Sequence, residues 1–316
     1  MTGLLAYSVF FLTIAGIYAI IVMGLNIQWG FTGLFNAGVV GFYAIGAYTC
    51  AVLIGPDRTF LFGGFGLPFA GGMLGAVVAA GLAGLVVALV TLRLSEEYLA
   101  IATFGIGISV QLVAINAAGL TGGTNGLYGL PRPFWNLTGD VAVFNLVYFA
   151  FVLVILGLIW AALARLIRSP WGRLLRAIRE DDVAARSLGK SPVRVRIQSF
   201  VIGSGIMGLA GALYTGYIGF VSPIDFIPIL TFQIWAMLIV GGSGSLLGGV
   251  VGSLVIWLVW TGSGTLLSRV APPELQAQAS AVQVILIGLI IVLTILFRPA
   301  GLIGEPRAVT PARRGG

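Results

Sequence analysis

The side chains that could perform chemistry are few, and the missing types exclude whole classes of function. The sequence contains no histidine and one cysteine, Cys50, which lies within an apolar run. A catalytic triad, a histidine general base and a histidine-ligated metal site are therefore excluded. One thiol also cannot form an intrachain disulfide or a thiolate metal cluster. We expect no enzyme here, and no metal or cofactor bound by this chain.

Adjacent acidic residues, at Glu96–Glu97 and Glu180–Asp182, are the remaining candidates for catalysis. A membrane-embedded enzyme would need acids clustered with other catalytic groups near one membrane face, so this class is a weak alternative. No charged residue lies near the middle of a clear apolar segment, where it would cost about 3 kcal/mol and mark a proton relay or an ion site. If the protein moves a solute, proton coupling is disfavoured, whereas Na⁺ coupling through backbone carbonyls stays open.

Uncharged amides are the polar groups that do occur in and beside the apolar segments. The run GLNIQWGFTGLFNAG, from Gly24 to Gly38, interrupts two such segments with glycine beside Asn, Gln and Trp. Irregular backbone at membrane depth occurs only where it is buried in protein or lines a cavity. A solute pathway and a simple tight turn are equally compatible with this run. The candidate pathway residues are Asn26, Gln28, Trp29, Asn36 and Tyr43.

A polar segment that begins at Arg168 has the signals of an amphipathic helix. Ser169 is a suitable N-cap, and Pro170 suits the first helical position. Apolar residues follow at i, i+3, i+4 and i+7 on one face, and arginines occupy the opposite face. The apolar residues are Trp171, Leu174, Leu175 and Ile178, and the basic ones are Arg173, Arg176 and Arg179.

Three consecutive acids, Glu180, Asp181 and Asp182, separate this helix from a second, shorter one. The second helix is expected from Val183 to Leu188, with Gly189 as the residue that ends it. A helix lying on anionic lipid headgroups would explain the basic face. It would not explain the acids or the second helix, so we favour a hairpin that docks another protein.

The composition indicates that these segments belong to an integral membrane protein. Of the 316 residues, 59% are hydrophobic and 9% are charged, and the mean hydropathy is +1.07. A soluble chain carries roughly 25% charged residues. We expect an all-α polytopic bundle, one permease domain over residues 1–316, with about eight to ten transmembrane helices, some short and broken.

Nine apolar segments meet the length of a membrane span, roughly 20 residues. The stretch Pro228–Leu267 is too long for one span, and GGSGSLLGG, from Gly241 to Gly249, is expected to divide it into two. The other expected spans are Leu5–Ile27, Leu34–Ile54, Phe69–Leu92, Tyr98–Ala118, Val141–Ile167, Ser199–Ile218 and Val282–Phe297.

The basic residues predict the topology. Nine of the 17 Lys and Arg lie between Arg165 and Arg196, and four more lie at or after Arg298. By the positive-inside rule the loop at residues 164–198 and the tail at residues 298–316 should be cytoplasmic. The N-terminus and the loop at residues 119–140 would then face outside, although one miscounted span reverses the N-terminus.

Small residues recur every fourth position in three segments, which gives each a smooth helix face for close packing. The three rows are Gly72–Ala76–Ala80–Gly84–Ala88, Ser204–Gly208–Ala212–Gly216 and Gly244–Gly248–Gly252.

Several ordered blocks resemble one known family, the LivM-type permease subunits of ATP-binding-cassette importers for branched-chain amino acids. The resemblance covers nearly the whole chain. The blocks are GLNIQWGFTGLFNAG with GFYAIGAYT, EEYLAIATFGIG, LTGGTNGLYGLP, SPWGRLLRAIREDDVAARSLG, AGALYTGYIGFVSP and GGSGSLLGGVVG. Importer permeases carry a coupling motif of Glu-Ala-Ala, three residues and Gly, which Val183, Ala184, Ala185 and Gly189 match except for the Glu. Many LivM-type chains have a His where this sequence has Val39, so no role of that His carries over.

The resemblance implies an assembly in the bacterial inner membrane. This chain would pair with a second, LivH-type permease, two cytoplasmic ATPases would dock on the loop, and an external solute-binding protein would deliver the substrate. ATP and Mg²⁺ would bind the ATPases, because this chain has no GxxxxGK[ST] motif. The implied ATPase-coupling residues are Trp171, Arg173, Arg176, Arg179, Glu180, Asp181, Asp182, Ala184, Ala185 and Gly189. Those implied to face the binding protein are Thr121, Gly122, Gly123, Asn125 and Gly126.

The main alternative to an importer permease is a secondary transporter or facilitator that works alone. Another alternative is a structural scaffold through which no solute passes. The solute class also stays open among branched-chain or other amino acids, short amides and urea. Neither alternative explains the ordered blocks.

Overall fold

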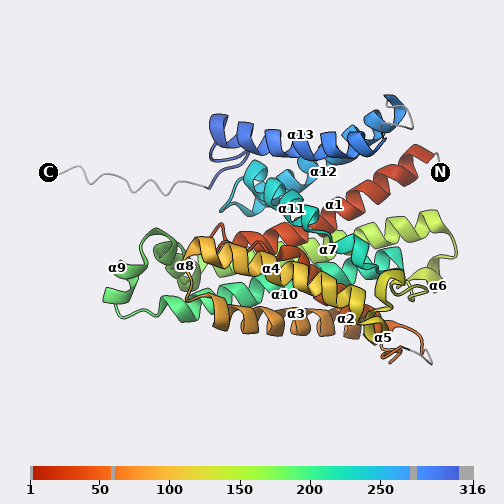
Figure 1. Ribbon diagram of the computed structural model, residues 1–316, viewed down its shortest axis with the longest axis horizontal. Coiled ribbons are helices and arrows are strands. Elements are labelled where there is room, and N and C mark those ends of the chain that lie inside the picture. Colours follow the sequence, from red (N-terminus) through yellow and green to blue (C-terminus); the bar gives the residue numbers. More distant parts are fainter. Residues whose placement is uncertain (1–2, 58–60, 271–275, 306–316) are drawn as a thin grey trace.

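The computed structural model describes residues 3–57, 61–270 and 276–305, and within them the fold is helical (Figure 1). Nine of its helices have 14 residues or more. They are α1 (Gly3–Gln28), α2 (Val39–Ile54), α3 (Phe69–Thr91), α4 (Glu96–Asn116), α7 (Val141–Arg168), α10 (Pro192–Ile218), α11 (Pro228–Gly241), α12 (Leu246–Val270) and α13 (Gln276–Phe297).

The nine helices coincide with the nine expected spans. Six of them, α1, α3, α4, α7, α10 and α12, are long and apolar enough to cross a membrane. Helices α2 and α11, and Ala281–Phe297 of α13, are shorter apolar helices. With so much apolar surface the chain is a multi-pass membrane protein. The starts differ most for three helices, since α2 begins at Val39 rather than Leu34, α10 at Pro192 rather than Ser199, and α13 at Gln276 rather than Val282.

The centre of the bundle is α10, which packs against α1, α2 and α3. Two of the predicted small-residue rows face each other here. A Cβ on Gly208 would lie 2.6 Å from the carbonyl oxygen of Ala76 and 2.4 Å from the Cβ of Ala80, and one on Gly84 would lie 2.6 Å from Ser204 Oγ. Glycine is therefore required for the two backbones to approach this closely.

The third row is only partly helical. Gly248 and Gly252 bring α12 against α11, because a Cβ on Gly252 would lie 1.9 Å from the carbonyl oxygen of Met237. Gly244 instead lies in the turn before α12, with φ of +79°, a conformation that favours glycine. The expected division of residues 228–267 is confirmed, with α11 ending at Gly241 and α12 starting at Leu246.

The short elements gather at the two ends of the bundle. α8 (Pro170–Glu180) and α9 (Asp182–Ser187) form one end, on the left of Figure 1. The other end carries α5 (Ala118–Thr121), η1 (Gly123–Asn125), α6 (Trp135–Thr138) and η2 (Pro223–Phe226), together with an antiparallel bridge between Leu127 and Val221. The described N-terminal residues lie at this second end (Figure 1).

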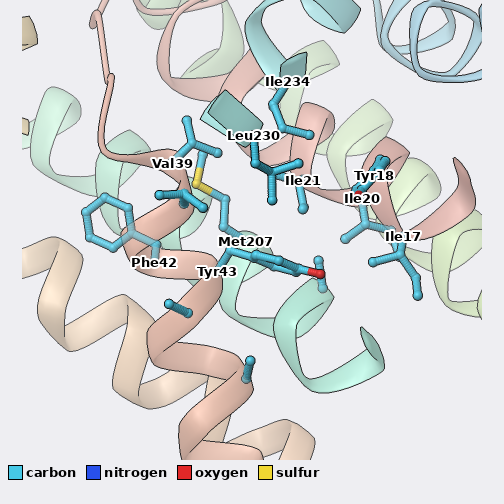
Figure 2. Close-up of a cluster of buried hydrophobic side chains, with 14 of the residues drawn as sticks. Ile17, Tyr18, Ile20, Ile21, Val39, Phe42, Tyr43, Met207, Leu230 and Ile234 are labelled. Carbon is cyan, nitrogen blue, oxygen red and sulfur yellow. The ribbon is translucent and has the colours of Figure 1, made fainter. Parts of the chain in front are cut away.

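The core between the ends is apolar and aromatic. Figure 2 shows the ring of Tyr43 of α2 pointing toward α1, where Tyr18 and Ile20 lie, with Met207 of α10 and Leu230 of α11 on one side of it. These side chains are at most 9% exposed. Side chains from α1, α2, α10 and α11 pack together here, and this close packing fixes the positions of the four helices relative to one another.

Candidate functional site

The hairpin of α8 and α9 begins as its local signals predict. Ser169 Oγ accepts a hydrogen bond of 3.2 Å from the Trp171 amide, and Pro170 occupies the first helical position. Trp171 Nε1 donates to Gln198 Oε1 at 2.8 Å, which fastens the start of α8 to α10. Gly172 approaches the carbonyl oxygen of Ile167 so closely that a Cβ would lie 2.1 Å from it.

The apolar face of α8 is buried against the bundle rather than against lipid. Leu175 and Ile178 are 0% and 1% exposed. They belong to a cluster with Met23 and Ile27 of α1 and with residues of α7 and α10. Any movement of α8 is therefore applied directly to the adjacent end of α1.

Two of the three acids, Asp181 and Asp182, have local structural partners that sequence reasoning did not foresee. Asp181 caps α9, because one of its carboxylate oxygens accepts from the amides of Val183 and Ala184 at 2.9 and 3.0 Å. Asp182 pairs with Arg186 at 2.8 Å and with Arg196 of α10 at 3.4 Å. Glu180 is exposed. Gly189 follows α9 with φ of +73°, as a residue that ends a helix does.

An apolar surface remains uncovered on α9. The side chains of Val183 and Leu188 are 71% and 79% exposed, whereas Ala185 is buried against the bundle at 5%. Ala184, Arg173 and Gly189 are also exposed. Exposed apolar side chains that form one continuous patch can mark a surface that a partner covers. The residues implied to couple to the ATPases included Ala184 but not these two apolar residues.

A second face of α8 is held by the C-terminal segment of the chain. Arg179 forms a salt bridge of 2.8 Å with Glu305, to which Arg176 lies at 4.0 Å. Arg179 also donates a hydrogen bond to the carbonyl oxygen of Gly30, and its Cγ would lie 3.3 Å from a Cβ on Gly33. The C-terminal segment thus lies at the same end as the hairpin, and residues 306–316 of the expected tail lie outside the described part of the chain.

The turn that Arg179 contacts is tied by Asn26 to the break between α11 and α12. Asn26 is fully buried, its Oδ1 accepts from the Gly244 amide at 2.9 Å, and its Nδ2 donates to the carbonyl oxygen of Ser245 at 2.9 Å. The Gly244 amide lies in the turn between α11 and α12, where no helix supplies its partner. The Ser245 carbonyl also accepts from the Gly249 amide of α12 at 3.1 Å. One amide therefore connects two helix breaks.

Gln28 and Asn36 connect the same turn to α10 and α11. Gln28 Nε2 donates to the carbonyl oxygen of Phe200, and Asn36 Nδ2 donates to Gln28 Oε1, at 2.9 and 2.7 Å. Trp235 Nε1 donates to the carbonyl oxygen of Asn36 at 3.0 Å. Trp29 packs edge-on against Trp235, with ring centroids 4.8 Å apart.

Four of the candidate pathway residues, Asn26, Gln28, Trp29 and Asn36, are thus brought together. The fifth, Tyr43, lies in the aromatic core instead. The amides of Asn26, Gln28 and Asn36 bind other parts of this chain in the described state, so they act as interhelical hydrogen bonds. Their role in a solute pathway stays a prediction.

The expected binding-protein loop folds onto the end that carries η2. Thr121 is 4% exposed, and its hydroxyl binds the carbonyl oxygen of Ala114 at 2.6 Å. Gly126 packs on Val221, whose carbonyl oxygen a Cβ would approach to 2.2 Å. Asn125 is exposed, while Gly122 and Gly123 have positive φ. Among these residues, Asn125 offers a side chain to the outside.

A polytopic helical bundle with broken helices, and with a hairpin at one end connected to those breaks, defines a transporter-type membrane protein. Residues 7–295 match the family described as branched-chain amino acid transport system, permease component. This chain belongs to that family and is a permease component.

Relatives agree with this assignment. The chain is 33% identical to the high-affinity branched-chain amino acid transport system permease protein LivM of Escherichia coli, over 96% of this chain and 71% of the relative. It is 26% identical to a probable LivM of Methanocaldococcus jannaschii, over 94% and 93% of the two chains. It is 28% identical to the E. coli permease protein LivH, over 93% of each. No solved structure matches the chain.

Proposed function

We propose that this chain is one permease subunit of an ATP-driven importer for branched-chain amino acids or similar small polar solutes. It would pair with a second, LivH-type permease, receive solute from an external binding protein, and be driven by two cytoplasmic ATPases that hold ATP and Mg²⁺. Family membership supports the class, and the names of the LivM and LivH relatives support the solute and the paired permease.

The observation that carries ATPase coupling is the docked hairpin. Its outer surface, with Val183 and Leu188, is free in the described chain, while its inner face is packed on α1, α7 and α10. A partner that covers the outer surface would move α8, and Arg179 would pass that movement to Gly30 and Asn26 at the broken helices. The hairpin therefore has the geometry of a transmission element.

A pulldown tests this role. Val183→Asp combined with Leu188→Asp places two charges on the proposed ATPase contact, where each would be desolvated without a partner. With the neighbouring genes coexpressed, we expect the tagged double variant to lose ATPase copurification at least tenfold while it still accumulates in the membrane. Leu137→Asp is the matched control, because Leu137 is 84% exposed at the opposite end. Equal ATPase recovery in double variant and control would exclude this surface as the contact.

A further inference from the structure

A half-buried carboxylate, Asp225, lies in the end of the bundle opposite to the hairpin. Asp225 belongs to η2, between α10 and α11. Its Oδ2 accepts from the Ser222 amide at 3.0 Å, and Ser222 Oγ accepts from the Ile224 amide at 3.5 Å, which together cap the short helix. Burial raises the pKa of this carboxyl, although the hydrogen bonds from Ser222 and Tyr214 act to lower it. Among the described residues, Asp225 has no salt-bridge partner.

Capping explains one oxygen of Asp225 but not the aromatic residues gathered around it. Tyr214 of α10 and Tyr18, Tyr43 and Tyr48 lie near enough to Asp225 to interact with its charge. The neighbouring Phe226 stacks edge-on to Tyr43, with ring centroids 5.2 Å apart. Tyr48 also packs on Phe226, with ring centroids 5.7 Å apart, and Tyr43 packs on Tyr214, at 5.8 Å. Phenols of α2 and α10 thus gather beside the segment that carries Asp225.

Two of these phenols lack hydrogen-bond partners. The hydroxyls of Tyr43 and Tyr48 are buried without a partner, and the side chains are 1% and 8% exposed. A buried hydroxyl without a partner costs about 1–3 kcal/mol, so two beside a half-buried carboxylate require an explanation. A ligand that donates several hydrogen bonds and carries positive charge would satisfy all three groups.

We propose that Asp225, with Tyr18, Tyr43, Tyr48 and Tyr214, binds the primary ammonium group of the transported solute. An ammonium offers three donors and one positive charge, which match one carboxylate and two free hydroxyls. The aromatic faces add cation–π attraction to an organic cation. The site rests on the proposed function and deepens it, because it selects amino acids over amides or urea.

The position of the site suits a solute that arrives from the binding-protein side. The bridge between Leu127 and Val221 joins the expected binding-protein loop to the segment that carries Asp225. Gln111 of α4 donates to the carbonyl oxygen of Pro223 at 3.2 Å, which holds η2 against the bundle. Solute released at the loop would meet this carboxylate before the amides at the opposite end.

Binding to the purified complex of this chain, its paired permease and the ATPases tests the site, because the binding protein would itself bind leucine and is left out. We expect Asp225→Asn to weaken binding of radiolabelled L-leucine about tenfold or more. In the wild type, 3-methylbutylamine, which is leucine without its carboxylate, should compete for the site, and 4-methylpentanoate, which lacks the ammonium, should not. In Asp225→Asn the competition by the amine should be lost.

Two further variants separate recognition from folding. Tyr48→Phe removes only a hydroxyl that has no partner in this chain, so a structural role predicts unchanged leucine binding, whereas the site predicts binding weakened severalfold. Asp140→Asn removes an exposed carboxylate at the same end and should bind like the wild type. If the wild type neither binds nor takes up L-leucine, the proposed function fails together with the site. If it takes up L-leucine and both site variants bind like it, the ammonium site alone is wrong.

Discussion

At the residue scale, buried amide side chains form the hydrogen bonds that the backbone of regular helices forms elsewhere in the bundle. The ends of α1, α11 and α12 leave peptide groups that no helix satisfies, and in a low-dielectric interior such groups are costly. Asn26 binds one donor and one acceptor of the break between α11 and α12. This explains why an amide, with both functions, lies fully buried there.

Asn26→Leu should therefore destabilise the protein strongly. It keeps the approximate volume but leaves the Gly244 amide without a partner, at a cost of about 2 kcal/mol. It also removes one of the two hydrogen bonds of the Ser245 carbonyl, which still accepts from the Gly249 amide. The measurement is the thermal unfolding midpoint of the detergent-purified chain. Asn116→Leu is the control, because Asn116 is exposed and binds only the Leu112 carbonyl of its own helix. Similar midpoints for the two variants would contradict this explanation.

Arg179 should matter for coupling rather than for assembly. Its contacts with Glu305 and Gly30 lie on the face of α8 that the bundle covers, so Arg179→Gln should leave ATPase copurification intact. We expect substrate-stimulated ATP hydrolysis to fall severalfold because the link from hairpin to helix breaks is weakened. Arg173→Gln, at an exposed position of the same helix, is the control for loss of charge. Loss of the ATPases from Arg179→Gln would place this residue in the docking contact instead.

Sequence reasoning located the polar residues but not their partners. It placed Asn26, Gln28 and Asn36 in an irregular run, because glycine and amides interrupt apolar segments there. It did not identify Glu305 as the partner of Arg179, since the two are 126 positions apart and only the fold brings them together. Of the tyrosines near Asp225, Tyr43 was a candidate pathway residue, whereas Tyr18, Tyr48 and Tyr214 were missed for the same reason.

At the element scale, the packing of α10 on α3 depends on small residues at the crossing. Both rows were predictable from spacing, because residues four apart share a helix face. Which row would meet which was not predictable, since any smooth strip can pack against any other. The prediction for the third row was wrong at its first residue, because Gly244 lies in a turn and not in the helix that the spacing predicted.

Gly208→Ala should separate these two helices. The added methyl would lie 2.6 Å from the Ala76 carbonyl oxygen, so α10 must shift, at a cost of about 1–3 kcal/mol. Gly157→Ala is the matched control on α7, where a Cβ meets nothing within 4 Å, and it should gain up to about 1 kcal/mol from helix propensity. Thermal unfolding of both variants checks the difference. A Gly208→Ala protein as stable as Gly157→Ala would show that this crossing is not close-packed.

At the scale of the whole molecule, the chain has two specialised ends joined by a tightly packed core. The hairpin and the C-terminal segment form one end, and the loops around η2 form the other (Figure 1). The span count and the hairpin followed from hydropathy and capping signals, which are local. The two ends are connected through α1, α2 and α10, and this connection could be seen only in the structure.

The most direct test of the account is uptake of labelled L-leucine by liposomes that contain either the complete complex or this chain alone. The complex comprises this chain, its paired permease, the ATPases and the binding protein. The account predicts uptake that requires ATP and every component, with none from the chain alone. Uptake by the chain alone without ATP would contradict it and establish an autonomous carrier.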